Sequence, residues 1–186
     1  MTEKEKAAKG LAYNPNRDPE LLREMQVAHA KCQKYNAISY EDEEQRHKLL
    51  AEIIHIGEQG TIMSPFFCDY GYNIHIGKNF FANTNFCVLD GARVQIGDNV
   101  FIGPNVGLYT AEHELHRDLR IEGIEYAFPI TIGNDVWIGG GTTIVAGVTI
   151  GDGAVIGAGS VVTHDIPAGV VAVGVPCKVM RKLEEK

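Results

Sequence analysis

The stretch that decides the fold is PITIGNDVWIGGGTTIVAGVTIGDGAVIGAGSVVTHDIP, residues 129–167. Within it, aliphatic residues recur six positions apart without a break, and glycine follows four of these six residues. They are Ile132, Ile138, Ile144, Ile150, Ile156 and Val162. Successive side chains of a strand point to opposite faces. A pattern that repeats every six residues with glycine at one position therefore requires the chain to turn a corner in each repeat. The stretch therefore predicts a coil of three sides whose neighbouring turns bury one another's faces.

A second periodic position, and the extension of the repeat upstream of residue 129, support the same coil. Small or β-branched residues stand two positions before the next aliphatic of each repeat, which suits a tight interior: Val136, Thr142, Val148, Ala154, Ser160 and Ile166. The same phase runs upstream through Ile96, Ile102 and Leu108, and more loosely through Ile76, Ala82 and Val88. Between Val88 and Ile96 it slips by two residues. We expect stacked coils over most of residues 57–173.

Helices are expected before the coil. Residues 18–35 have few helix breakers, with Asp18 as N-cap and Pro19 at the first helical position. Ser39 followed by Asp42 resembles a capping box, so a second helix is expected to start there and to end near Gly57. The chain then divides into a helical segment at 1–56, the coil at 57–173 and a tail at 174–186.

A polar excursion at residues 109–129 interrupts the repeat. Long loops in compact domains usually carry function or are disordered. This one contains His113 and His116, and histidine titrates near neutral pH, so it can take a proton from an alcohol. The loop is the first candidate for chemistry.

Composition excludes several classes of protein. A formal charge of −7 argues against nucleic-acid binding, which needs a basic face. The charged N-terminus lacks an apolar signal segment and no long apolar run follows, so we expect a cytoplasmic protein without membrane contact. The four cysteines are widely spaced, which indicates reduced thiols, and none is tied by sequence to an activating base.

The motifs resemble the maltose and galactoside O-acetyltransferases of the hexapeptide-repeat superfamily, and the maltose enzymes more closely. The resemblance rests on the His113 loop, on the repeat stretch itself, and on three further segments: DYGYNIHIGKNFFANTN (69–85), IGDNVFIGPNV (96–106) and GVPCKVMRK (174–182). It implies a mainly β fold, a left-handed parallel β-helix with a small N-terminal helical cap. It also implies acetyl-CoA as co-substrate, a sugar hydroxyl as acceptor, and a homotrimer with its sites between subunits.

The resemblance assigns roles to residues on the acceptor side. His113 matches the general base, His116 a neighbour of lesser role, and Asn83 an asparagine that faces acceptor and base. Asp69 and Asp90 match acceptor-binding positions, and the aspartate at 69 favours glucose or maltose. Gly91 and the Asn14–Pro15 pair stand where galactoside enzymes offer acidic residues, which weakens the case for a galactoside.

On the donor side the resemblance implies that acetyl-CoA lies along the last coils and the tail. The matching positions are Gly140, Ala158, Thr163, His164, Lys178 and Arg181. The Gly140 N–H is a candidate donor to the thioester oxyanion, and Lys178 with Arg181 is expected to hold phosphates. Trp137 fits either the donor cleft or trimer packing.

The sequence leaves open two hypotheses that place the chain in other protein classes. A γ-carbonic-anhydrase-like enzyme would bind zinc between subunits through three histidines, with His75 as a possible third ligand beside His113 and His116. A non-catalytic β-helix scaffold would have equally regular ladders. Among transferases, a galactoside or another sugar or xenobiotic acceptor is the alternative to glucose and maltose, and no metal is expected to be required.

Overall fold

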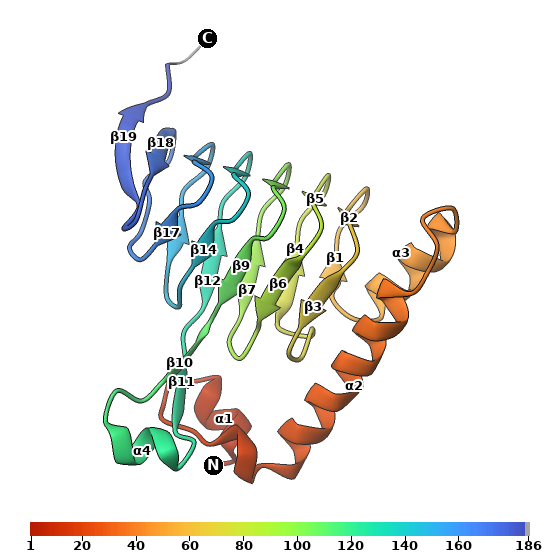
Figure 1. The fold of residues 1–186 in the computed structure, drawn as a ribbon, viewed down its shortest axis with the longest axis vertical. Helices are drawn as coiled ribbons and strands as arrows, with labels where there is room; N and C mark the ends of the chain where they lie inside the picture. The colour runs from red at the N-terminus through yellow and green to blue at the C-terminus, as the bar shows by residue number, and fades with distance from the viewer. Residues whose placement is uncertain (185–186) are drawn as a thin grey trace.

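Three parallel sheets wind into a left-handed β-helix in the computed structural model, which describes residues 1–184 (Figure 1). The first face comprises β1 (His55–Ile56), β4 (Ile74–Ile76), β7 (Val94–Ile96), β12 (Ile130–Ile132) and β15 (Thr149–Ile150). The second comprises β2 (Thr61–Ile62), β5 (Phe81–Ala82), β8 (Phe101–Ile102), β13 (Trp137–Ile138), β16 (Val155–Ile156) and β18 (Val170–Val173). The third comprises β3 (Phe66–Cys68), β6 (Phe86–Leu89), β9 (Gly107–Tyr109), β14 (Thr143–Ile144) and β17 (Val161–Val162).

The strand register follows the period read from the sequence. Ile132 pairs with Ile150, so the later coils repeat after eighteen residues, which is three hexads. Ile76 pairs with Ile96, so an earlier coil takes twenty residues and absorbs the two-residue slip. The predicted β-helix and its irregular upstream turn are both confirmed.

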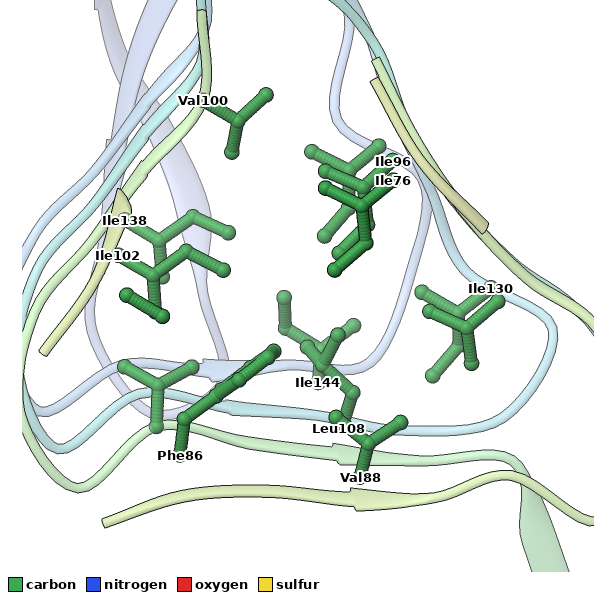
Figure 2. Close-up of a cluster of buried hydrophobic side chains, with 14 of the residues drawn as sticks. Ile76, Phe86, Val88, Ile96, Val100, Ile102, Leu108, Ile130, Ile138 and Ile144 are labelled. Atoms are coloured by element: carbon green, nitrogen blue, oxygen red, sulfur yellow. The ribbon is translucent and has the colours of Figure 1, made fainter. Parts of the chain in front are cut away.

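The aliphatic ladders form one continuous core inside the triangle (Figure 2). In Figure 2, Ile76 and Ile96 stack in one column, while Ile102 lies over Ile138 in another. The small polar residues of the interior are satisfied: the Thr142 hydroxyl donates to the Gly139 carbonyl and the Ser160 hydroxyl to that of Gly157. Buried hydroxyls without such partners would be costly, so the corners are built to accept them.

One corner of the triangle is built from residues with left-handed backbone. Asn79, Asn99 and Asp135 have φ of 51°, 57° and 58°, which asparagine and aspartate tolerate better than other non-glycine residues. Their side chains also bond along the axis, from Asn79 Nδ2 to Asn99 Oδ1 at 2.9 Å and from Asn99 Nδ2 to Asp135 Oδ1 at 2.8 Å. These residues therefore both turn the chain and link successive coils.

Helices precede the coil: α2 and α3 lie over its N-terminal end, while α1 lies beside the β10–β11 hairpin of the insertion (Figure 1). They are α1 (Glu3–Ala7), the 3-10 turn η1 (Pro15–Arg17), α2 (Pro19–Asn36) and α3 (Glu43–Ala51). The start of α2 is as predicted, with the Asp18 carboxylate accepting from two N–H groups of the first turn. The Asn36 side chain exchanges hydrogen bonds with the backbone of Phe66, which ties the end of α2 to the first coil.

The expectation for the second helix was wrong at both ends. Asp42, rather than Ser39, is the N-cap of α3, and Ser39 instead accepts from the Glu41 N–H in the preceding turn. The helix ends at Ala51 rather than near Gly57, because Ile53 and Ile54 turn into the core. Strand β1 then begins at His55, two residues before the expected start of the coil.

The insertion at 109–129 has regular structure. Strands β10 (Ala111–His113) and β11 (Glu125–Ala127) pair antiparallel, and α4 (Arg117–Ile121) lies between them. In the tail, β19 (Lys178–Lys182) folds back antiparallel on β18, and residues 185–186 of the expected tail lie outside the described range. Across residues 1–184, no helix combines the length and the apolar character that crossing a bilayer demands.

Candidate functional site

His113 is held beside a carboxylate by the pairing of β10 with β11. The register places His113 opposite Glu125, and His113 Nδ1 lies 3.6 Å from Glu125 Oε1. The His113 side chain is 64% exposed, whereas that of Glu125 is only 17% exposed. A carboxylate on one ring nitrogen fixes the ring and leaves the other nitrogen free to take a proton from a bound molecule.

Tyr13, from the N-terminal segment, fixes Glu125. The two residues exchange backbone hydrogen bonds of 3.0 and 2.9 Å, and the Tyr13 hydroxyl donates to Glu125 Oε2 at 3.3 Å. Burial raises the pKa of Glu125, while the nearby His113 opposes that rise. Burial also raises the pKa of the Tyr13 hydroxyl, so it stays protonated and keeps donating.

Asp90 supports the neighbouring loop from beneath. Its Oδ1 accepts from the N–H groups of Asp69 and Tyr70 at 3.1 and 2.8 Å, and its Oδ2 accepts from Gly71 at 2.7 Å. The side chain is fully buried, so the expectation that Asp90 itself binds the acceptor does not fit the structure. Asp90 instead fixes the backbone that carries Asp69.

Asp69 lies above Asp90 and is partly accessible. Its carboxylate lies 3.7 Å from His29 Nε2 of α2, and its side chain is 22% exposed. Burial, followed by the charge of Glu125, raises the pKa of Asp69 to about 6. Burial lowers the pKa of His29, whose ring packs 4.7 Å from that of Phe67. Asp69, Glu125 and His113 thus form an acidic cluster in which Glu125 acts on both other side chains.

The raised pKa of Asp69 predicts a pH-dependent stability. Because the folded pKa, about 6, exceeds that of the unfolded chain, this group favours folding below pH 4 and the benefit is lost as pH rises through 6. Between pH 8 and pH 5, the wild type should gain about 1 kcal/mol of unfolding free energy relative to Asp69→Asn. Urea unfolding of both proteins at each pH measures this difference, and parallel curves would contradict it.

Gly91 and the Asn14–Pro15 pair lack acidic side chains, and the residues around them explain what occupies these places instead. A Cβ atom on Gly91 would lie 3.0 Å from the Tyr13 hydroxyl, so the space of a side chain there is taken by Tyr13. Asn14 donates to the Glu122 carbonyl and accepts from the Asn16 N–H, and Pro15 opens η1.

Asn83 does not lie with His113 in one chain. It follows β5, at the corner between the second and third faces, and its side chain accepts from the Thr84 N–H. His113 extends from the corner between the third and first faces, at the other end of the third face. The two side chains can meet only if different subunits supply them.

The donor-side positions lie on the last coils. Gly140 and Ala158 stack at the corner that also carries Asn83, where Gly159 donates to the Gly140 carbonyl at 2.9 Å. Within residues 1–184, the Gly140 N–H donates to no backbone carbonyl, which leaves it available to a ligand. A Cβ on adjacent Gly139 would come within 2.5 Å of the Ala158 nitrogen, so glycine is required for this stacking.

The remaining donor-side residues lie at the C-terminal end of the coil and in the tail. Thr163 and His164 lie after β17, with Thr163 Oγ1 2.8 Å from His164 Nδ1. Lys178 and Arg181 lie on β19, every residue of which is exposed. Trp137 is 57% exposed on the second face, between Phe101 and Val155 of the adjoining coils.

Cys87 and His75 lie in settings that do not favour chemistry. Burial, followed by the charge of Asp69, raises the pKa of Cys87 to about 11, which disfavours the nucleophilic thiolate. His75 stacks on His55 along the first face, with ring centroids 4.4 Å apart, while His113 faces Glu125 on the hairpin. Among residues 1–184, no three histidine, cysteine or acidic side chains come together as a metal site.

Glu125, Tyr13 and His29 were not predicted from the sequence as site residues. Glu125 comes to His113 through antiparallel pairing inside the insertion, which the six-residue period does not reveal. The acidic–aromatic pair Glu125–Tyr126 opposite a histidine-bearing segment was the only available signal. Tyr13 and His29 are brought to the site by tertiary packing of the helical segment.

Three sequence-family patterns match parts of the chain. The pattern described as the maltose acetyltransferase hexapeptide capping motif matches residues 6–57. The bacterial transferase hexapeptide pattern of six repeats matches residues 129–164, and the hexapeptide repeat of succinyl-transferase matches residues 93–109. Together they cover most of the helical segment and two stretches of the coil.

Solved structures match over the whole chain. A maltose O-acetyltransferase from Clostridium difficile is 48% identical, with a TM-score of 0.97 over 100% of this chain and 99% of the other. A galactoside acetyltransferase in complex with coenzyme A is 43% identical, with a TM-score of 0.96 over 99% and 92%. A hexapeptide-repeat acetyltransferase of Vibrio cholerae complexed with acetyl coenzyme A is 38% identical, with a TM-score of 0.91 over 100% of both chains.

Proposed function

The chain belongs to the maltose and galactoside O-acetyltransferase family of hexapeptide-repeat enzymes, and from this membership we infer that it moves an acetyl group from acetyl-CoA to a sugar hydroxyl. The observation that carries the proposal is the placement of His113 beside Glu125, whose charge also acts on Asp69. Histidine fixed by a carboxylate suits a general base, and carboxylates suit the hydroxyls of a sugar.

In the proposed reaction, His113 removes the proton of the acceptor hydroxyl while its oxygen attacks the thioester carbonyl. The Nδ1 atom faces Glu125, so Nε2 is the nitrogen that takes the proton. The carbon–sulfur bond breaks, the thiolate of CoA leaves with the electron pair, and the imidazolium returns its proton to that thiolate. The acetyl group ends on the sugar oxygen, and no acyl-enzyme forms.

Asp69 and Glu125 are proposed to accept hydrogen bonds from the acceptor, with Asp90 fixing the loop beneath them. The aspartate at position 69 is the residue type that the resemblance associates with glucose or maltose, so we propose these acceptors ahead of a galactoside. Gly91 supports this preference because its side-chain space is filled by Tyr13.

The donor is proposed to lie along the last coils. The free Gly140 N–H is positioned at a corner of small residues, where it can donate to the developing oxyanion. Ala158, Thr163 and His164 then line the path of the pantetheine arm. Lys178 and Arg181 would hold the phosphates of CoA as fixed positive charges.

We propose that the active enzyme is a homotrimer in the cytoplasm. Asn83 and the Gly140–Ala158 corner lie at the opposite end of the third face from His113. A neighbouring copy that presents this corner to the His113 hairpin would complete each site, with the base from one subunit and Asn83 from the next. Light scattering of the purified protein tests the assembly.

Release of CoA from acetyl-CoA tests the proposed reaction. Glucose, maltose, a methyl galactoside, glucosamine and chloramphenicol are offered to the purified protein as acceptors. We expect kcat/KM to be highest for glucose or maltose. Faster turnover of the galactoside would remove the acceptor preference but keep the transferase, whereas binding of neither CoA nor any acceptor would remove both.

Replacing Lys178 and Arg181 together by glutamine should weaken the donor half of the site alone. Two exposed cations that each contribute about 0.5–1 kcal/mol to phosphate binding predict a KM for acetyl-CoA raised about tenfold, with kcat within twofold. The difference from wild type should shrink in 0.5 M salt, because exposed charges are screened. Lys48→Gln, on the distant α3, serves as the control and should match wild type.

A further inference from the structure

A cavity lies between the N-terminal segment and the corner of the coil that joins the third and first faces. Its volume is about 570 Å³, within the range of small-molecule sites. Residues 4–10 of the α1 region form one wall, and residues 91–93 and 127–129 of the coil form the other. Asp69, His113 and Glu125 do not line it, but Tyr13 and Gly91 do, so the cavity adjoins the acceptor side of the proposed active site across Tyr13.

The charged side chains at this cavity are all cationic. Lys4, Lys9 and Arg93 line it and no carboxylate does, although the protein as a whole carries a charge of −7. Lys4 is paired with Glu20 and Glu24. Lys9 and Arg93 form no ion pair with any residue of the described range 1–184, and the Arg93 guanidinium donates only to the Gln95 side-chain oxygen.

The walls beside these cations are apolar and aromatic. Four aromatic rings line the cavity: Tyr13, Tyr70, Tyr72 and Phe128. The rings of Tyr70 and Tyr72 lie 5.7 Å apart at a tilt of 42°. Beneath them, Ala7, Leu21, Ala92 and Ala127 form a small separate core with Tyr13. A flat apolar molecule can therefore be covered on several sides.

We propose that this cavity binds a small aromatic anion, an aryl ring carrying a phosphate or carboxylate group. The ring lies among the tyrosines and Phe128, and the anionic group meets Lys9 and Arg93. Both parts are needed, because two exposed cations hold a free anion only weakly in water and a small ring alone buries little surface.

Isothermal titration with phenyl phosphate tests the site, with inorganic phosphate and phenol as partial probes. We expect one phenyl phosphate per chain, and at least tenfold weaker binding of either partial probe. Lys9→Gln combined with Arg93→Gln should weaken phenyl phosphate at least tenfold, and Lys9→Gln alone, at an exposed residue, about threefold. Lys34→Gln combined with Arg117→Gln, two cations outside the cavity, is the matched control.

Two further titrations separate this site from the proposed active site. Binding of phenyl phosphate should be unchanged in His113→Ala and in the presence of saturating CoA. Displacement by CoA would assign the anion to the basic tail and overturn the proposal, as would absence of binding or equal binding by the Lys9 and Arg93 variants. Because these are binding measurements, they stand whether or not the protein acetylates a sugar.

Discussion

Replacing His113 by alanine is expected to lower kcat by about 10²- to 10⁴-fold, the usual contribution of a general base. The Kd for acetyl-CoA should stay within about twofold, because His113 lies on the insertion while the donor-side residues lie on the last coils. A rate loss of this size corresponds to about 3–5 kcal/mol of transition-state stabilisation. Single-turnover CoA release, together with calorimetric binding of acetyl-CoA, separates the two quantities.

His116→Ala is the matched control for that experiment. His116 lies on the same insertion and precedes α4, but its side chain makes no capping hydrogen bond there. Its backbone N–H donates to Glu114, which the substitution leaves in place. We expect kcat within about threefold of wild type. Full turnover in His113→Ala, or an equal loss in His116→Ala, would end the assignment of His113 as base.

The repeat made the fold predictable, since its period is a property of the chain itself. An aliphatic every six residues requires a corner every six residues, and the pairing of Ile132 with Ile150 is what that rule predicts. The two-residue slip upstream of Ile96 was also meaningful, because the coil there is two residues longer than the later coils. Handedness was different: the resemblance implied it, and periodicity did not.

Features outside the repeat were predicted less well because they depend on contacts distant in sequence. Ser39 and Asp42 are both good caps, and packing of Ile53 and Ile54 into the core decides where α3 lies. The short helices α1 and α4 have too few turns to leave a periodic signal. Glu125 was missed for the same reason, since its approach to His113 depends on a hairpin.

Asp69 and Asp90 show how a motif can identify residues without their roles. Asp69 and Asp90 were both predicted from the sequence to bind the acceptor, yet one is partly open and the other is fully buried. Their hydrogen bonds differ in the same way. The Asp90 carboxylate accepts from three successive backbone N–H groups, and the Asp69 carboxylate accepts from none of them. Sequence can name an aspartate, but burial decides whether it faces a ligand or the backbone.

Asp90→Ala is therefore expected to destabilise the protein by about 2–5 kcal/mol. Leaving the buried Gly71 N–H without an acceptor costs about 1–3 kcal/mol, and the half-buried N–H groups of Asp69 and Tyr70 add about 0.5–1 kcal/mol each. Against this, burial raises the pKa of Asp90 to about 6 even though the backbone hydrogen bonds lower it, so alanine also relieves some cost of burying a carboxylate. The lost hydrogen bonds outweigh that relief, and urea unfolding at pH 7 and fixed protein concentration measures the balance.

Asp98→Ala is the comparison that isolates burial as the cause. The Asp98 carboxylate accepts from the Lys78 N–H at 2.7 Å, but it does so at an exposed corner where water can replace it. We expect a loss below about 1 kcal/mol. The kcat/KM for the acceptor should fall in Asp90→Ala but not in Asp98→Ala, because only Asp90 fixes the loop of Asp69. Equal stability of the two variants would mean that water enters beneath the loop and replaces the carboxylate, and the positioning role of Asp90 would then be wrong.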